Sequence, residues 1–210
     1  MVLGMIKEHG LLIVISGPSG SGKTSITKIL RETEANLNFS ISATTRPPRP
    51  DELDGVDYYF FSEVEFQHKI EAGEFAEWAV YGSHHYGTLK KTLNDTLQSG
   101  KDILLEIEVQ GAIQLRKLYP DGIFIFIIPP SQASLEARLR NRRTESEDDI
   151  RRRLLIAKSE ISYINNYDYI VFNYDNQIEK AVENVRCIIA AVRCRVNRYI
   201  LRQIQKEFNL

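Results

Sequence analysis

The chain has 210 residues, 43% of them apolar and 26% charged, and its formal net charge is −1. This length and composition are ordinary for a folded protein with one sizeable core and room for one or two small inserted lobes, and they exclude a disordered chain. A net charge near zero gives no general attraction to nucleic acid or to an anionic membrane, so an anion site has to be a local cluster of cations. Since no apolar run approaches the roughly 20 residues of a membrane helix and the N-terminus lacks a signal-peptide pattern, we expect a cytoplasmic protein.

Four apolar runs bounded by turn residues predict buried strands. They are LLIVIS at 11–16, DILLEIEV at 102–109, IFIFIIPP at 123–130 and DYIVFN at 168–173. Helical patterns lie at 22–33, 63–72, 88–99, 111–117, 131–141, 146–162 and 176 to about 207. Strands that alternate with helices predict an α/β fold, a doubly wound core with a mostly parallel sheet.

Two segments depart from this alternation. Residues 40–95 contain the shorter, more polar strand-like pieces ISATT and YYFFS with several turn residues, which predicts an inserted mixed α/β lobe. Residues 136–153 are rich in arginine interleaved with acids, which is typical of an exposed and mobile helical segment. We therefore predict a core of residues 1–39, 96–130 and 154–210, an inserted lobe of residues 40–95, and a separate helical segment of residues 131–153.

A phosphate-binding motif directly follows the first predicted strand. It matches the P-loop pattern G-x-x-x-x-G-K-[ST] between a strand and a helix, the context that this motif requires. Its backbone N–H groups would point at a polyphosphate, its lysine would span the outer phosphates, and its last hydroxyl could ligate Mg²⁺. The motif residues are Gly17, Pro18, Ser19, Gly20, Ser21, Gly22, Lys23 and Thr24. They predict a nucleoside triphosphate with its metal, but P-loops serve hydrolases, switches, motors and kinases alike.

A second anion site is predicted in the stretch SATTRPPRPDELDGVDYYF at 42–60. Arg46 and Arg49 stand among three prolines there, and two adjacent tyrosines follow. A guanidinium offers a planar fork of donors that fits phosphate, and proline reduces the conformational freedom that a loop loses on ordering. A chain with two anion sites can hold a donor phosphate and an acceptor phosphate together.

Several motifs in one order resemble guanylate kinase. They are GPSGSGKTS at 17–25, S-x-TTRxPR-x-x-E-x-x-G-x-DYxF at 42–60, EFxEW at 74–78, HYGT at 85–88, VQGA at 109–112, RLRNRRTES at 138–146 and YDYIVFN at 167–173. The resemblance covers about residues 10–190. It implies Mg²⁺-dependent transfer of the ATP γ-phosphoryl group to GMP or dGMP, giving ADP and GDP, in purine nucleotide metabolism and GMP recycling. It also implies a P-loop core, a GMP-binding lobe and a lid.

The resemblance implies a role for each matching residue. The implied GMP-binding residues are Arg46, Arg49, Tyr58 and Tyr86 at the phosphate, Ser42, Glu77, Thr88 and Glu108 at the guanine, and Glu52. The implied catalytic residues are Lys23 and Arg46 with the lid arginines Arg138, Arg142 and Arg153. Glu106 would reach the metal through a water molecule.

Chemistry supports the choice of Glu77 for base discrimination. Guanine presents adjacent N1–H and N2–H₂ donors, which one carboxylate can accept together, whereas adenine lacks this pair. Loss of a matched buried set leaves a polar group without a partner, which costs about 1 to 3 kcal/mol per group. The acceptor phosphate is already an anion at pH 7, so the transfer requires positioning and charge neutralisation rather than a base.

The strand before VQGA departs from the family pattern. The family usually carries aspartates in a D-x-D arrangement, whereas this chain has Glu106 and Glu108. Each glutamate keeps the charge and adds one methylene group. The metal and guanine roles of these residues are therefore compatible with the charge, and their geometry is an open question for the structure.

Two other functions fit the same motifs. One is a guanylate-kinase-like module that binds phosphorylated peptides through the lobe, and the other is a P-loop kinase with a different phosphorylated acceptor. The complete P-loop and the lid arginines favour an enzyme, and Ser42, Glu77 and Thr88 favour guanine. The C-terminal helical pattern carries an apolar stripe from Val182 to Phe208, which either packs on the core or forms a homodimer contact.

Overall fold

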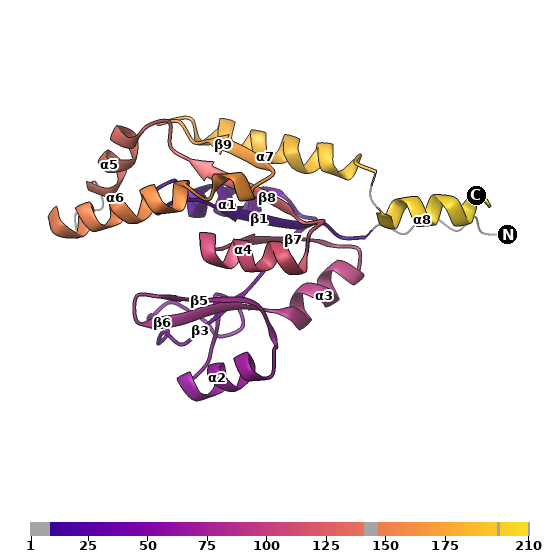
Figure 1. The fold of residues 1–210 in the computed structure, drawn as a ribbon, viewed down its shortest axis with the longest axis horizontal. Helices are drawn as coiled ribbons and strands as arrows, with labels where there is room; N and C mark the ends of the chain where they lie inside the picture. The colour runs from indigo at the N-terminus through magenta and orange to yellow at the C-terminus, as the bar shows by residue number, and fades with distance from the viewer. Residues whose placement is uncertain (1–8, 141–146, 197, 210) are drawn as a thin grey trace.

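The computed structural model describes residues 9–140, 147–196 and 198–209. Five parallel strands form the core sheet in the order β2-β7-β1-β8-β9. They are β1 (Leu12–Ser16), β2 (Leu37–Phe39), β7 (Asp102–Glu106), β8 (Ile123–Ile128) and β9 (Tyr169–Phe172). Helices cover both faces of this sheet (Figure 1): α1 (Lys23–Thr33) and α7 (Ile178–Arg193) on one face, α3 (Lys90–Gln98) and α4 (Val109–Leu118) on the other. The predicted doubly wound α/β core is confirmed.

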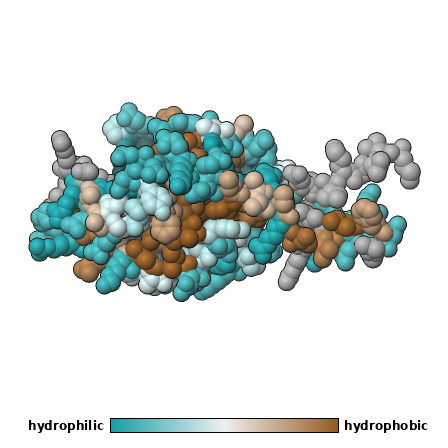
Figure 2. Space-filling view, turned by 90° about the horizontal axis from the view of Figure 1, so that it is seen from above, coloured by the Kyte–Doolittle hydropathy of each residue, from teal (hydrophilic) through white to brown (hydrophobic). Residues whose placement is uncertain are grey.

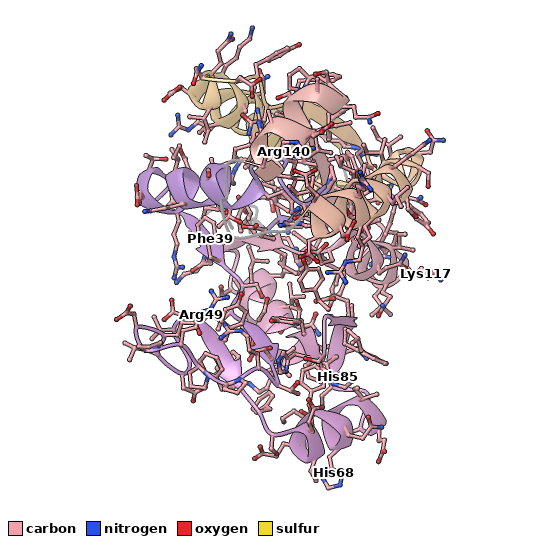
Figure 3. The ribbon with its side chains drawn as sticks, turned by 90° about the vertical axis from the view of Figure 1, so that its left-hand side faces the viewer. Phe39, Arg49, His68, His85, Lys117 and Arg140 are labelled. Atoms are coloured by element: carbon pink, nitrogen blue, oxygen red, sulfur yellow. The ribbon has the colours of Figure 1, made fainter. Side chains whose placement is uncertain are left out.

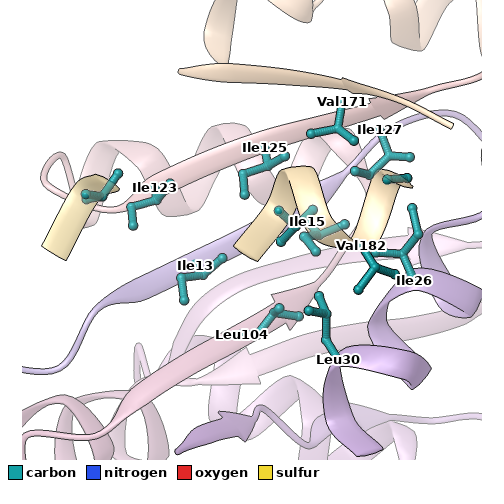
Figure 4. Close-up of a cluster of buried hydrophobic side chains, with 13 residues drawn as sticks. Ile13, Ile15, Ile26, Leu30, Leu104, Ile123, Ile125, Ile127, Val171 and Val182 are labelled. Carbon is teal, nitrogen blue, oxygen red and sulfur yellow. The ribbon is translucent and has the colours of Figure 1, made fainter. Parts of the chain in front are cut away.

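The core strands are apolar along their whole length because both faces of the sheet are buried. In β1, Ile13 and Ile15 point toward α1 and α7, while Leu12 and Val14 point toward α3 and α4. Figure 4 shows the first of these clusters, in which isoleucines from adjacent strands meet α1 and α7. This packing fixes the carboxyl ends of β1 and β7 beside each other, where the P-loop and Glu106 lie.

An inserted lobe lies beneath the core in Figure 1. Its mixed sheet has the order β4-β3-β6-β5, with β3 (Ser42–Thr44), β4 (Tyr58–Phe60), β5 (Phe75–Tyr81) and β6 (His84–Leu89). Helix α2 (Glu63–Glu71) packs on the far face of this sheet through Phe66. Its N-terminus carries a capping box between Ser62 and Glu65. The side chain of Gln114 on α4 bonds the backbone N–H and C=O of Trp78, which ties the lobe to the core.

Two helices form the projection at the other end of the core. They are α5 (Gln132–Arg140) and α6 (Glu147–Ile161), and a short 3₁₀ turn, η1 (Ile164–Asn166), leads from α6 toward β9. Leu135 and Leu139 of α5 pack against Leu154 and Ala157 of α6. The first turn of α6 carries three acids, which suits the positive end of a helix dipole.

The C-terminal pattern forms two helices instead of the single helix predicted to run to about residue 207. Helix α7 ends at Arg193, and α8 (Arg198–Glu207) follows after a turn and projects from the body (Figure 1). Val182, Val185 and Val192 are buried on α7. The later part of the stripe is less buried, and Figure 2 shows apolar side chains on the projecting helix. Leu201 on α8 is 44% exposed, Ile204 is half-buried, and Phe208, directly after α8, is 67% exposed. The periodicity alone did not reveal the break.

Two other local predictions need correction, and three strands were missed. The strand predicted at 102–109 ends at Glu106, because α4 starts at Val109. The helix predicted from residue 88 begins at Lys90, since Thr88 still pairs with Glu77 in the lobe sheet. Strands β2, β5 and β6 were not predicted. Within the described ranges, no helix has the length and apolar character that crossing a bilayer requires.

Candidate active site

The P-loop wraps the end of β1 and opens α1. Gly22 precedes α1 with a φ of 91°, a left-handed conformation that favours glycine. A Cβ at this position would lie 2.2 Å from Nδ2 of Asn173, which itself donates to the carbonyl of Ser21 at 2.9 Å. The side chain of Asn173, which follows β9, therefore supports the P-loop from outside. Lys23 is buried, and its Nζ donates to the carbonyl oxygens of Gly17 at 2.6 Å and Pro18 at 3.1 Å.

Glu106 meets α1 at the carboxyl end of β7. Its Oε1 accepts a hydrogen bond from Oγ1 of Thr24 at 2.6 Å, and its Oε2 accepts one from Oγ1 of Thr27 at 2.6 Å. Thr24 and Glu106, which the sequence predicts at the metal, are therefore adjacent. A hydroxyl and a carboxylate are hard oxygen donors, the type that Mg²⁺ prefers.

The lobe sheet gathers polar side chains on the face toward the core. Ser42 is paired with Tyr58 across β3 and β4, and Glu77 is paired with Thr88 across β5 and β6. Residues two apart on a strand share a face, so Tyr86 lies on the same face as Thr88. The opposite face is apolar and buries Ala43, Phe66 and Phe75. The sheet therefore has one face for its own core and one for a ligand.

Glu77 is the most deeply buried acid on this polar face, with 5% of its surface exposed. Its Oε1 accepts a hydrogen bond from Oγ1 of Thr88 at 2.7 Å. Burial raises the pKa of Glu77 to about 7, and the bond from Thr88 only partly offsets that rise. A Cβ on Gly111 would lie 2.3 Å from Oε2 of Glu77, so the glycine of VQGA lets α4 approach this carboxylate.

Glu52 holds the two predicted phosphate arginines in different ways. Nη2 of Arg46 donates to its Oε1 at 2.8 Å, and the backbone N–H of Arg49 donates to its Oε2 at 2.8 Å. The backbone bond from Arg49 and the Arg46 guanidinium lower the pKa of Glu52. The Arg46 guanidinium also lies over the ring of Tyr58, 5.4 Å from its centroid. Arg46 is thus fixed before any phosphate binds.

Arg49 is held through its backbone N–H, and its side chain makes only a long ion pair with Glu52. That side chain is 74% exposed, although one of its nitrogens lies 3.9 Å from Glu52. In Figure 3, Arg49 lies on the same side of the molecule as Phe39, a residue that lines the cleft between core and lobe. Such exposure is compatible with a residue that closes on a ligand, so the structure fixes Arg46 more firmly than the Arg49 guanidinium.

The helices α5 and α6 bring two of the predicted lid arginines to the P-loop. Arg138 donates to the carbonyls of Ser21 and Asn173 and pairs with Asp175, at 3.2, 2.7 and 2.7 Å. Nη2 of Arg153 contacts Oγ of Ser19. Arg142 lies outside the described residues.

An acid pair, Glu108 and Glu160, lies close to the P-loop lysine. Burial and the neighbouring Glu108 carboxylate raise the pKa of Glu160, while Lys23 and the backbone N–H of Ser19 oppose the rise. Glu160 is seven residues after Arg153 on α6, so both side chains project from one face of the helix toward the P-loop. Glu108 was predicted at the guanine, and in the structure it lines the cleft and neighbours Glu160.

Eight of the predicted site residues line one cleft of about 700 Å³, whereas Arg46, Arg49, Glu52, Thr88 and residues 17–22 of the P-loop are not among its lining residues. Its walls include Lys23, Thr24, Glu106 and Glu108 from the core and Ser42, Tyr58, Glu77 and Tyr86 from the lobe. A second cavity of about 630 Å³ lies between α5, α6 and the end of β8 and contains none of the predicted site residues. The first cleft is therefore the candidate active site.

Sequence reasoning missed three polar residues of this region. Thr27 bonds Glu106 from the buried face of α1, Asn173 braces the P-loop, and Glu160 joins Glu108. The spacing of Thr24 and Thr27, three residues apart on a helix, was the only available signal, because it places both hydroxyls on one face. Asn173 and Glu160 reach the site from distant parts of the chain, which no local pattern indicates.

Comparison with known proteins gives concordant matches. The guanylate kinase family model matches residues 9–192. A guanylate kinase from Caldanaerobacter subterraneus subsp. tengcongensis is 50% identical over 193 residues, which are 92% of this chain and 93% of that protein. One from Halalkalibacterium halodurans is 47% identical over 196 residues, 93% and 95% of the two chains. The crystal structure of guanylate kinase from Anaplasma phagocytophilum is 30% identical with a TM-score of 0.76, covering 99% of this chain and all of that one.

Proposed function

Because the chain belongs to the guanylate kinase family, whose members are ATP:GMP phosphotransferases, we propose that it transfers the γ-phosphoryl group of ATP to GMP with Mg²⁺, giving ADP and GDP. One observation carries the assignment of the acceptor. The buried Glu77, bonded by Thr88, faces the same cleft as Lys23 and Thr24 of the P-loop. A donor site for polyphosphate and an acceptor site for a base with adjacent N–H groups are thus combined in one cavity.

On the donor side, the P-loop residues 17–24 hold the ATP phosphates. Their backbone N–H groups and the start of α1 favour negative charge, and Lys23 turns from the loop carbonyls toward the outer phosphates. Thr24 and Glu106 would hold Mg²⁺, directly and through water, and the metal would neutralise charge on the phosphates when bound. In the described ranges no three His, Cys, Asp or Glu side chains are grouped to bind a metal, which suits an ion that is held largely by substrate phosphates.

On the acceptor side, the lobe binds GMP. Ionised Glu77 accepts from guanine N1–H and N2–H₂, with Ser42, Thr88 and Glu108 around the base. Arg46, Tyr58 and Tyr86 bind the phosphate, and Glu52 holds Arg46 in place and orders the loop that carries Arg49. Arg49 completes this site by closing on the ligand. The fixed contacts of Arg46 support its role, because a pre-oriented guanidinium loses little freedom on binding.

Transfer requires positioning and charge neutralisation. The GMP phosphate attacks as an anion, so no side chain has to remove a proton in the transfer step. Lys23, Arg46 and the lid arginines Arg138, Arg142 and Arg153 offset the negative charge that spreads over the transferring group. Lid closure would exclude water, which otherwise competes as acceptor and would hydrolyse ATP.

The finer assignments are part of the same proposal. We assign residues 40–95 to the GMP-binding lobe, 131–153 to the lid and the rest to the core. We place the enzyme in the cytoplasm, in purine nucleotide metabolism, with dGMP as a second acceptor. The exposed apolar side of α8 supports a homodimer contact made by this helix. The two other candidate functions are the phosphopeptide-binding module and the kinase for another acceptor. One assay distinguishes both of them from the proposed function.

The test measures ADP formation from ATP and Mg²⁺ with GMP, dGMP, AMP, dTMP or no acceptor, and identifies the diphosphate product. Turnover confined to GMP and dGMP would support the proposal. Turnover with another acceptor would assign a different kinase. Binding of GMP without turnover would point to a binding module.

A further inference from the structure

The carboxylate of Glu106 is held at both of its oxygens by one face of α1. Thr24 bonds Oε1 and Thr27 bonds Oε2, each at 2.6 Å. These residues are three apart, so their hydroxyls are neighbours on the helix surface. Thr24 is exposed and Thr27 is 6% exposed, and both border the cleft. Glu106 therefore has one oxygen bonded by an exposed residue and the other bonded by a nearly buried one.

The Thr27 hydroxyl has two acceptors within reach, one inside α1 and one on Glu106. A threonine in a helix commonly bonds a backbone carbonyl of the preceding turn. Oγ1 of Thr27 does lie 3.1 Å from the carbonyl oxygen of Thr24, but its contact with Glu106 is shorter at 2.6 Å and goes to a charged acceptor. A bond to an ionised group is the stronger of the two. The hydroxyl is therefore committed mainly to Glu106.

A glutamate at this position needs such a second contact more than an aspartate would. Its additional methylene group adds a rotatable bond and extends the carboxylate by about 1.5 Å. Thr24 alone can anchor one oxygen but leaves the carboxylate free to turn about that contact. A donor at the second oxygen fixes the plane of the group.

We propose that Thr27 is a positioning residue for the donor site, which holds Glu106 in the orientation that presents Oε1 and the Thr24 hydroxyl to the divalent cation of bound ATP. This inference rests on the donor half of the proposed function. Although Thr27 also borders the cleft, the role assigned to it is its bond to Oε2 of Glu106. It acts through Glu106, as outer residues commonly do when they orient a ligand to a metal.

The test compares the affinity of a fluorescent ATP analogue with and without MgCl₂, in the full chain and without GMP. Thr27→Val removes the hydroxyl and keeps the shape of the side chain. Thr27→Ser keeps the hydroxyl. Thr96→Val is the matched control, because the Thr96 hydroxyl bonds only the carbonyl of Thr92 within its own helix, at 2.9 Å.

Thr27→Val should reduce the gain in affinity that Mg²⁺ gives by about 10- to 100-fold. The affinity of Thr27→Val for the analogue without Mg²⁺ should stay within about threefold of the parent. The gain in affinity from Mg²⁺ in Thr27→Ser and in Thr96→Val should stay within the same range, which is ordinary variation for a surface or shape-conserving change. In a Glu106→Asp background, the further change Thr27→Val should have little effect, because the shorter side chain no longer reaches both hydroxyls. Should Thr27→Val fail to fold, Thr27→Ala in the same comparison has the same expected result.

An unchanged gain from Mg²⁺ in Thr27→Val would overturn the proposal. So would an equal loss of affinity with and without Mg²⁺, since that result would assign Thr27 to the packing of α1. The assay needs no acceptor and is therefore independent of GMP. If Thr27→Val loses the gain in ATP affinity that Mg²⁺ gives the parent, but the parent shows no turnover with GMP, the proposed function fails while the role of Thr27 stands.

Discussion

Replacement of Glu77 by glutamine should stabilise the free protein at alkaline pH while it removes most of the activity with GMP. Glu77 is 5% exposed and has one hydrogen bond from Thr88, which a glutamine carbonyl can also accept. Its charge is therefore buried with incomplete compensation, and glutamine removes that charge. The proposed ATP site at the P-loop and Glu106 should bind ATP as before.

The size of the effect follows from the pKa of the buried carboxyl. An ordinary glutamate has a value of 4.5, and burial raises the pKa of Glu77 to about 7 in the folded chain. Since the folded state binds the proton more tightly, this group loses stability as pH rises from about 4.5 to about 7. The full loss of stability is about 3 kcal/mol above pH 8, and it disappears at pH values below the pKa of this carboxyl in the unfolded chain. For a chain of this length that corresponds to roughly 6 to 12 °C in melting temperature.

The measurement is thermal unfolding of the parent and of Glu77→Gln at pH 5 and pH 8.5, without nucleotide. We expect the variant to melt higher at pH 8.5 and to gain much less at pH 5. Glu71→Gln, the same change at an exposed glutamate of α2, should have no such pH-dependent effect. A variant that is destabilised equally at both pH values would refute the conclusion that Glu77 carries an uncompensated buried charge.

The same pKa predicts how GMP binding responds to pH. Guanine N1–H and N2–H₂ need the ionised carboxylate, which is only partly populated near pH 7 in the free protein. The KM for GMP should therefore fall as pH rises from 6 to 8, and binding at pH 7 should release a proton to the buffer. Unchanged GMP kinetics in Glu77→Gln would remove this residue from base recognition.

Three further predictions concern the arginines and the C-terminal helix. Arg49→Ala should raise the KM for GMP at least about tenfold, the loss typical of a charged hydrogen bond, with ATP affinity nearly unchanged; equal weakening of both substrates would contradict separate anion sites. Arg153→Met should lower kcat by about 100-fold with little change in ATP affinity, and weaker ATP binding at an unchanged kcat would show that it acts only before the transfer. Removal of residues 197–210 should convert a dimer into a monomer in light scattering, whereas a monomeric full-length chain would contradict the α8 contact.

The core could be predicted from sequence because burial on both faces leaves a continuous apolar run. LLIVIS, DILLEI and IFIFII are such runs, and each of them is a strand of the parallel sheet. Strands with one polar face were harder. β5 and β6 carry Glu77 and Thr88 for the cleft side, so their alternation is weak and Thr88 was assigned to the following helix. The polar residues that define the site thus reduced the signal of the strands that hold them.

The site was predicted best where a motif is contiguous. The P-loop and the stretch from Ser42 to Phe60 each contain their own turn chemistry, and both line or border the cleft. Contacts between distant segments could not be read in this way. Thr27 bonds a residue 79 positions later, and Asn173 bonds Ser21 across 152 positions, so only the packed sheet brings them together. Their partners became visible only in three dimensions.

The chain leaves the core for the lobe after β2 and returns in α3, so every lobe contact with the acceptor comes from one uninterrupted stretch between Phe39 and Lys90. β2 and β7, the strands on either side of this excursion, are neighbours in the core sheet. The exit and the return are therefore both anchored in one edge of the core. Exchange of this stretch would leave the P-loop and Glu106 in place, but a new lobe would have to restore the contacts of Trp78 with Gln114 and of Glu77 with Gly111 on α4. Recombination at two points thus gives evolution, or an engineer, a route to a new phosphoryl acceptor on an unchanged core.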